Sequence, residues 1–280
     1  MRSFGQIAFR AVCYREPERI EEFRKRHIAE TDASAEEFMR RLGGYPDVTG
    51  KRVLDVGCGF GALAIRLARD GAAAVHGVDI GRISIEAANR RLAGEAPDVA
   101  DRVSFQIIER LSDVEERNYD IAVLKDSFEH IDDPEGFVRE IGEGDYLAPH
   151  GLLTIGFGPL WKSPFGGHLE RMTRFPWAHL IFPERAIMLE RRRFSLGPWD
   201  GAMHFTEVEG GLNRMTYGRF IRALKDGGFV SEHFAVNVKH GSRAAEIMRR
   251  ARRVAPLREY FTFNVYTTWR RASEERPEHG

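Results

Sequence analysis

The chain has 280 residues, with 42% hydrophobic and 30% charged side chains, so it is long enough to bury a full core as a soluble globular protein. Its 42 basic and 42 acidic residues cancel, which argues against a general electrostatic attraction to nucleic acid or to an anionic membrane. Two cysteines in unrelated contexts exclude a disulfide framework, and we find no membrane-spanning apolar run and no secretory signal pattern, so we expect a cytoplasmic protein with no membrane span.

The first 50 residues have helical patterning. Residues 18–30 and 35–42 carry apolar side chains along one side of a helix, and the glycine- and proline-containing residues 43–46 end the second stretch. We therefore predict an N-terminal helical cap over residues 1–50. Packing is its favoured role, and direct contact with a substrate is the alternative.

A strand, a glycine turn and a helix come next, and the rest of the chain is organised around them. The apolar run 53–56 predicts a buried strand, and the helical spacing of residues 62–70 predicts a helix. Between them, Gly57, Gly59 and Gly61 predict a turn in which the backbone can approach a nucleotide-like ligand closely.

Two acids narrow the class of ligand. Asp55 lies two residues before the first glycine, where a phosphate would not favour a carboxylate but an ammonium group would. Asp79 ends a second predicted strand, 75–79, where an acid can accept both hydroxyls of a ribose. Together they indicate a nucleoside that carries a cation. An NAD-binding loop is disfavoured because residues 62–64 follow Gly61 without a glycine at the required spacing.

Residues 53–61 resemble the first motif of the class I S-adenosylmethionine-dependent methyltransferases, and the resemblance extends over about residues 50–157 and 212–270. It implies methyl transfer as the activity and S-adenosyl-L-methionine as the cofactor, with S-adenosyl-L-homocysteine as its product. In this family an acid after the third strand, usually Asp, commonly reaches the adenine amino group, which implies that role for the longer Glu109. An exposed loop residue without this role is the alternative. The residues to which the resemblance assigns cofactor binding are Asp55, Gly57, Cys58, Gly59, Gly61, Asp79, Ile80, Glu109, Lys125 and Asp126.

Strands continue to alternate with helices as far as residue 157, which favours a parallel, doubly wound sheet. Helices are predicted over residues 84–92, with Ser84 as the cap, and from Asp133-Pro134 onwards. Ligands of such sheets bind beyond the carboxyl ends of the strands. The predicted third, fourth and fifth strands are 103–108, 119–124 and 152–157.

The same alternation returns after residue 212. A helix is predicted over 216–224, a strand over 229–238 and a basic helix over 243–253, while 261–265 alternate like a strand near a sheet edge. The family resemblance implies that the last two strands form a hairpin. The predicted fold class is therefore α/β: a Rossmann-like, doubly wound, mostly parallel seven-stranded sheet with an antiparallel last strand and an inserted lid.

This pattern divides the chain into a cap and four further parts. Residues 51–157 form the S-adenosylmethionine-binding core, 212–272 are its C-terminal part, and 273–280 are a polar tail that we expect to be mobile. Residues 158–211 contain three of the four tryptophans and are too long for an ordinary connection, so we predict a lid or substrate-recognition insertion. Its residues 175–183 could instead form a homodimer contact.

Histidines are the candidates for removing a proton from an oxygen acceptor, since a neutral hydroxyl is a poor nucleophile. We predict catalytic roles for His130, just beyond the fourth strand, and for His168, which follows two glycines of a flexible loop. A packing role at the helix start is the alternative for His130. His179 and His204 are weaker candidates.

A metal and a nucleic acid are both disfavoured. Asp126, Asp132 and Asp133 have the oxygen ligands that magnesium prefers, but Asp132-Asp133-Pro134 is also an ordinary helix start, and we expect no metal. Methyltransferases of DNA base amino groups carry Asn/Asp-Pro-Pro-aromatic after the fourth strand, whereas residues 125–128 are Lys-Asp-Ser-Phe. We therefore expect a small-molecule acceptor and no nucleic acid.

These expectations converge on S-adenosylmethionine-dependent methylation of a small molecule. Oxygen in a sugar or a secondary-metabolite hydroxyl is the favoured acceptor. The alternatives are N- or C-methylation, a quinone or lipid precursor as acceptor, and a protein that binds the cofactor without transferring its methyl group.

Overall fold

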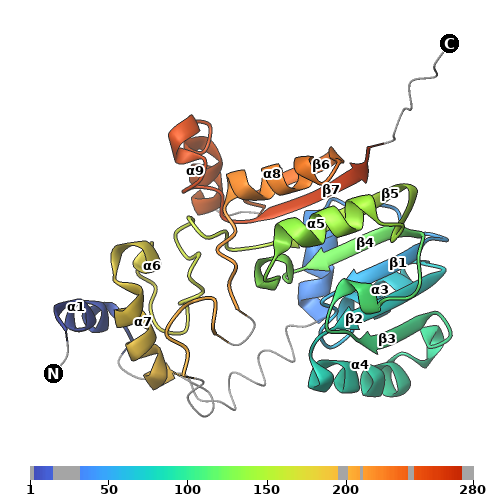
Figure 1. Ribbon diagram of the computed structural model, residues 1–280, viewed down its shortest axis with the longest axis horizontal. Coiled ribbons are helices and arrows are strands. Elements are labelled where there is room, and N and C mark those ends of the chain that lie inside the picture. The colour runs from blue at the N-terminus through green and yellow to red at the C-terminus, as the bar shows by residue number, and fades with distance from the viewer. Residues whose placement is uncertain (1–2, 15–31, 195–200, 209–210, 239–242, 273–280) are drawn as a thin grey trace.

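The computed structural model describes residues 3–14, 32–194, 201–208, 211–238 and 243–272, and its centre is a seven-stranded sheet (Figure 1). The strand order across the sheet is β3-β2-β1-β4-β5-β7-β6. The strands are β1 (Arg52–Val56), β2 (Ala74–Asp79), β3 (Val103–Ile107), β4 (Tyr119–Lys125), β5 (Leu147–Phe157), β6 (Phe229–Val236) and β7 (Val265–Arg271).

The directions of the strands confirm the predicted fold class. Strands β1 to β5 pair in parallel, whereas β7 lies between β5 and β6 and is antiparallel to both. The order reverses between β1 and β4, which places the switch point of the sheet at the carboxyl ends of these two strands.

Helices cover both faces of the sheet and make two apolar cores. One core packs α5 and α8 against the sheet through buried side chains such as Ile141 and Phe220. The other packs α3 and the helical residues 32–41 against the opposite face, where Leu63 and Phe38 are buried. The helices of the sheet region are α3 (Ala62–Arg69), α4 (Arg82–Glu95), α5 (Pro134–Glu143), α8 (Tyr217–Asp226) and α9 (Arg243–Ala251).

The last strand differs from its predicted position. We expected residues 261–265 near an edge, but β7 begins at Val265 and lies inside the sheet. Its centre carries Thr267 and Thr268, both fully buried, and the Thr268 hydroxyl is 3.2 Å from the Thr154 hydroxyl of β5. Thr268 is thus paired with Thr154, and the Thr267 hydroxyl donates to the Ile155 carbonyl, so both polar side chains are satisfied inside the sheet.

The two predicted helix starts had different outcomes. The Asp133 carboxylate accepts a hydrogen bond from the Gly136 amide at 2.9 Å, as expected for a cap. Ser84, however, does not cap α4, which begins at Arg82 after Gly81. The Gly81 amide instead donates to Asp79 Oδ1 at 2.7 Å, so the helix starts close to the end of β2.

A third apolar cluster lies apart from the sheet. Helix α1 (Phe4–Val12) packs against α7 (Glu184–Arg191), and Phe9, Ile187 and Phe205 are buried between them and the neighbouring loops. Figure 1 shows α1, α6 (Ala178–Ile181) and α7 together, to one side of the strands. The described insertion thus has a small core of its own, while the predicted helical residues 18–30 lie outside the described part of the chain. In the described residues, no helix combines the length and apolarity needed to cross a bilayer.

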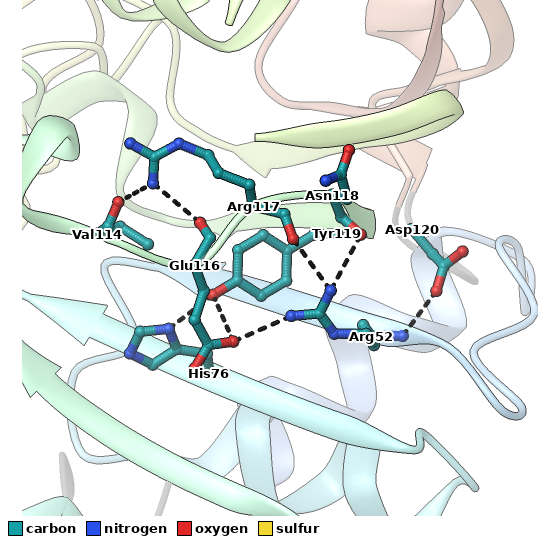
Figure 2. Close-up of polar contacts among 8 residues, drawn as sticks. All are labelled: Arg52, His76, Val114, Glu116, Arg117, Asn118, Tyr119 and Asp120. Carbon is teal, nitrogen blue, oxygen red and sulfur yellow. Dashed lines mark hydrogen bonds and ion pairs between the residues drawn. The ribbon is translucent and has the colours of Figure 1, made fainter. Parts of the chain in front are cut away.

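A polar network joins β1, β2 and β4 toward their amino ends (Figure 2). The Tyr119 hydroxyl lies 2.7 Å from His76 Nδ1 and 3.4 Å from Glu116 Oε2. Arg52 donates to the same Glu116 carboxylate at 3.1 Å, and its backbone amide donates to Asp120 Oδ2 at 2.8 Å. The buried polar atoms at this end of the sheet are therefore connected to charged groups at the surface.

Candidate functional site

The glycine turn after β1 forms a cradle with no room for a side chain at two of its three glycines. Gly57 has a φ of +74°, and a Cβ there would lie 2.5 Å from Ser127 Cβ. Gly61 has a φ of +77°, and a Cβ there would lie 2.5 Å from the Phe105 ring. Both the left-handed backbone and the close approach require glycine, as expected for a loop that a ligand meets through its backbone.

Asp79 fixes the shape of this loop at the end of β2. Its Oδ2 accepts the Gly59 amide at 2.9 Å and its Oδ1 accepts the Gly81 amide at 2.7 Å. A carboxylate oxygen can accept a further hydrogen bond, so the group can hold the loop and still receive a ligand hydroxyl. The next residue, Ile80, has 75% of its surface exposed beside the cradle.

Asp55 is a buried acid without a counter-ion in direct contact. It is 1% exposed, and its Oδ2 has no hydrogen-bond partner. Burial raises the pKa of this carboxyl to about 7, while Lys125 opposes the rise and Asp79 adds to it. A positively charged ligand group would remove the cost of an unpaired buried carboxylate, so the orphaned oxygen and the glycine cradle both fit S-adenosylmethionine.

The other predicted cofactor residues surround the same strand ends. Lys125 and Asp126 follow from β4 and form an ion pair at 2.8 Å. Cys58 is buried in the glycine turn, and burial raises the pKa of its thiol. Glu109 is exposed after β3, where its backbone amide donates to Asp113 Oδ2 at 2.8 Å. The structure thus brings these residues to one edge of the sheet, and their roles toward the cofactor stay predictions.

The two predicted catalytic histidines are neighbours in space. Their ring centroids are 6.1 Å apart. His130 is exposed, and its Nδ1 is 2.6 Å from the Gly211 carbonyl. His168 has a buried Nε2 without a partner. Burial lowers the pKa of His168, and His130 adds to this effect while Glu170 opposes it.

Glu129 completes this group, although it was absent from our sequence-based candidates. It is 4% exposed, and its Oε2 has no partner. Burial raises the pKa of its carboxyl to about 8, with Asp126 adding to the rise and Lys125 opposing it. The available signal was an acid between the apolar Phe128 and a candidate histidine, but a glutamate at such a position is most often exposed.

Two cavities flank the residues that follow β5. The smaller cavity has a volume of about 10 Å³, and its lining includes Glu129, His168 and Arg214. A larger cavity of about 130 Å³ lies where Gly158 and Asp126 meet the helical residues 32–41 and the start of β7. Its other lining residues are mostly polar or aromatic: Ser34, Glu37, Phe38, Arg41, Phe263, Asn264 and Tyr266.

The weaker candidates have structural partners. The His179 ring bonds the Trp161 carbonyl, and His204 Nδ1 is 3.5 Å from Glu184 Oε2 at the surface. Asp133 serves as the α5 cap, as described above. Within the described residues, no group of three or more histidine, cysteine or acidic side chains is arranged to hold a metal ion.

Comparison with known sequences places residues 54–153 in a family model described as a methyltransferase domain. The chain is 38% identical over 125 residues to a ubiquinone biosynthesis O-methyltransferase of Neisseria meningitidis, covering 44% of this chain and 50% of that one. It is 33% identical over 140 residues to the 27-O-demethylrifamycin SV methyltransferase of Amycolatopsis mediterranei, covering 48% and 50%. The chain therefore spans about half the length of the curated relatives it matches.

Solved structures share the fold over most of the chain. An S-adenosylmethionine-dependent methyltransferase from Mesorhizobium loti superposes with a TM-score of 0.52 at 20% identity, covering 83% of this chain and 96% of that one. The [4+2]-cyclase SpnF superposes with a TM-score of 0.53 at 18% identity, covering 86% and 80%. At these identities the likeness concerns the fold alone.

Proposed function

Because this chain belongs to the class I S-adenosylmethionine-dependent methyltransferases, we propose that it methylates a hydroxyl oxygen of a small molecule. When bound, the cofactor supplies an electrophilic methyl group. The name of the Neisseria relative specifies oxygen as the methylated atom, and so does that of the rifamycin relative. The residues of this chain then have three tasks: to hold the cofactor, to accept a proton and to exclude water.

Asp55 and Asp79 are the principal cofactor ligands in this proposal. Asp79 accepts the ribose hydroxyls while it holds the Gly59 and Gly81 amides. Asp55, which has an unpartnered oxygen, faces the cationic part of the cofactor. Gly57 and Gly61 allow the left-handed loop to pack directly against Ser127 and Phe105, because any side chain there would collide with them.

His168 is the base, and the observation that carries this assignment is its buried, unpartnered Nε2. In this assignment the neutral ring carries its proton on Nδ1, so that Nε2 is the acceptor. Since burial lowers the pKa of the ring, His168 is neutral near pH 7 and able to take a proton from a hydroxyl. His130, next to it, contacts the substrate or orients the His168 ring.

The insertion keeps water from the reacting atoms. Trp161 lies over the small cavity, and its backbone is bonded to Met215 at 2.8 Å. The Arg214 guanidinium lies 5.2 Å from the centroid of the Trp161 ring, which ties the insertion to the C-terminal part of the sheet. Such enclosure strengthens the hydrogen bonds and charges inside a site.

A sugar or another secondary-metabolite hydroxyl is the favoured acceptor. The polar lining of the 130 Å³ cavity beside Asp126 supports it, because a polyhydroxylated ring needs many hydrogen-bond partners. A quinone or lipid precursor is the second candidate, and the name of the Neisseria relative favours it. Methylation of nitrogen or carbon, and cofactor binding without transfer, are the remaining alternatives.

Incubation with S-adenosylmethionine labelled in its methyl group and an extract of small metabolites tests this function. We expect the label to enter a compound as an ether methyl group. The variant Gly57→Val should neither bind the cofactor nor transfer label, since the new side chain would meet Ser127 within 2.5 Å. Binding of the cofactor by the wild type without any labelled product would overturn methyl transfer, and label on nitrogen or carbon would overturn the choice of oxygen.

A further inference from the structure

Three buried polar atoms without partners belong to residues that line one cavity. They are Oε2 of Glu129, Nε2 of His168 and Nε of Arg214. The rest of the lining offers few polar side-chain groups: it comprises Pro159, Trp161, Gly166, Leu212 and Met215. Because buried polar atoms in folded proteins nearly always have a partner, three orphans around one cavity indicate a ligand group that pairs with them.

Neighbouring contacts hold these residues in place. Asn213 lies between them: its backbone amide donates to the Glu129 carbonyl at 2.9 Å, and its side-chain amide donates to the Phe128 and Ile131 carbonyls at 2.8 Å. Arg214 donates through Nη2 to Glu184 at 2.7 Å, which holds the guanidinium while its buried Nε has no partner. The cavity is therefore built before any ligand arrives.

The protonation states follow from these surroundings. Burial raises the pKa of the Glu129 carboxyl to about 8; Asp126 adds to the rise, Lys125 opposes it, and these two are paired with each other. Arg214 is the cation that shares the cavity lining with Glu129. Glu129 therefore keeps its proton at neutral pH and is a donor. Arg214 Nε is a donor as well. The proposed role of His168 as base places the proton of the neutral ring on Nδ1, so its buried, unpartnered Nε2 is the acceptor.

We propose that this cavity is a subsite for a single hydroxyl group, which receives hydrogen bonds from Glu129 and Arg214 and donates one to His168. A hydroxyl has one donor and two acceptor positions, whereas a carboxylate or carbonyl has no donor and an ammonium group has no acceptor. The space of about 10 Å³ suits one oxygen atom. The inference rests on the proposed function in one respect: it takes this hydroxyl to be the one that is methylated.

The subsite makes Glu129 and Arg214 residues that determine specificity. As the hydroxyl gives its proton to His168, the oxygen keeps the electron pair of the broken O–H bond. The two donors then stabilise the developing negative charge, as the donors of an oxyanion hole do. An amine presents two hydrogens and one lone pair, so it leaves one donor of the subsite unpaired, and the site selects against nitrogen acceptors.

A crystal structure of the wild type at pH 7 and an infrared spectrum test the subsite without any acceptor. We expect one water molecule within about 2.7–3.2 Å of all three orphaned atoms. We also expect a protonated-carboxyl band that disappears in Glu129→Gln. An empty cavity, an ion in place of the water, or an unchanged infrared band would overturn the assignment.

Substitutions of Glu129 test its role as a donor. The probes are phenol, benzyl alcohol and aniline, each with labelled S-adenosylmethionine. Glu129→Gln keeps an N–H donor and should retain turnover within about threefold, whereas Glu129→Leu should lose about tenfold or more, the equivalent of one hydrogen bond. Glu115→Gln, at an exposed position, is the matched control and should behave as the wild type.

The outcomes separate the two hypotheses. If Glu129→Gln lowers turnover as much as Glu129→Leu, Glu129 acts as a charged group. If Glu129→Leu leaves turnover unchanged, Glu129 does not contact the acceptor. Either result overturns the subsite. Aniline methylated faster than both hydroxyl probes would do the same. If no probe is methylated by the wild type, the proposed function loses support, while the water and the infrared band still decide whether the subsite exists.

Discussion

The sheet has a polar cluster toward each end of its strands, and the two clusters differ in how they are satisfied. Toward the amino ends, His76 and Tyr119 are buried, yet they are paired with each other, and the Tyr119 hydroxyl is also bonded to Glu116 (Figure 2). At the carboxyl ends, Asp55 and Glu129 are buried to a similar degree, and each keeps an oxygen without a partner.

This difference separates stability from function within one sheet. A buried polar group that is paired contributes to folding, whereas an unpaired one costs about 1–3 kcal/mol. In the cluster at the amino ends, the Glu116 carboxylate forms an ion pair with Arg52. At the other end Lys125 is paired with Asp126, and within the described part of the chain neither Asp55 nor Glu129 forms an ion pair. The unsatisfied end is the one where ligands are expected to bind.

The largest effect should follow removal of the proposed base. His168→Ala should slow methyl transfer by about 10²–10⁴-fold, because a positioned general base typically contributes that much. The affinity for S-adenosylmethionine should stay close to that of the wild type. Single-turnover kinetics and calorimetry measure the two quantities. His150→Ala, at an exposed position on β5, is the control. Unchanged turnover in His168→Ala would mean that positioning alone drives the reaction or that another group takes the proton.

Loss of the β2 acid should weaken the cofactor site. Asp79→Ala removes the acceptor of two loop amides and of the proposed ribose hydroxyls. A charge-assisted hydrogen bond is worth roughly 1.5–3 kcal/mol, so the dissociation constant of S-adenosylmethionine should rise by about one to two decades. Calorimetry on the folded variant, with the exposed Asp101→Ala as control, measures the change. Equal affinities would remove Asp79 from the cofactor site.

The free energy of unfolding should depend on pH through the buried carboxyl of Glu129. The pKa of Glu129 is raised from 4.5 to about 8 in the folded protein, so the fold holds a proton that the unfolded chain releases. Its contribution to stability is complete below about pH 4.5 and is lost as the pH rises toward 8. Relative to Glu129→Gln, the wild type should lose up to about 1.4 kcal/mol per pH unit in that range. Urea unfolding at several pH values tests this, and parallel curves for the two proteins would contradict it.

The stability contribution of the His76–Tyr119 cluster should fall as the pH decreases, opposite to that of Glu129, and by a smaller amount. Burial lowers the pKa of His76, so its contribution to stability is lost as the pH falls below its ordinary value of 6.5. Tyr119→Phe removes the hydroxyl that bonds His76 and should cost about 0.5–1.5 kcal/mol at pH 7. Cofactor affinity should not change, since the network lies at the other end of the sheet. A weaker affinity in this variant would show that the two ends are coupled.

Much of the fold could be predicted because its signals are local. The strand before Gly57 and the cap at Asp133 are each encoded by residues a few positions apart. The predicted range 261–265 was wrong, since β7 is Val265–Arg271, because the burial of Thr267 and Thr268 depends on β5, more than 100 residues earlier in the chain. No local pattern contains that pairing.

The candidate site was predicted in part for the same reason. Asp55 and Asp79 follow directly from their places at strand ends, which the sequence pattern fixes. Glu129 was missed because its burial depends on contacts with Asn213 and the insertion. Arg214 was missed for a similar reason: its role depends on Glu184 and Trp161, which only the folded insertion brings close.

Because β7 lies between β5 and β6, one edge of β5 stays unpaired until the C-terminal part of the chain has been synthesised. Strand β5 ends at Phe157, but the strand that covers its free edge begins only at Val265. At ribosomal rates of about 5–20 residues per second, that edge stays open for roughly 5–20 s. Since Trp269 and Val265 belong to the core under α5 and α8, that core cannot close earlier. During this interval β5 is an unpaired strand edge of the kind that chaperones protect and that aggregation exploits.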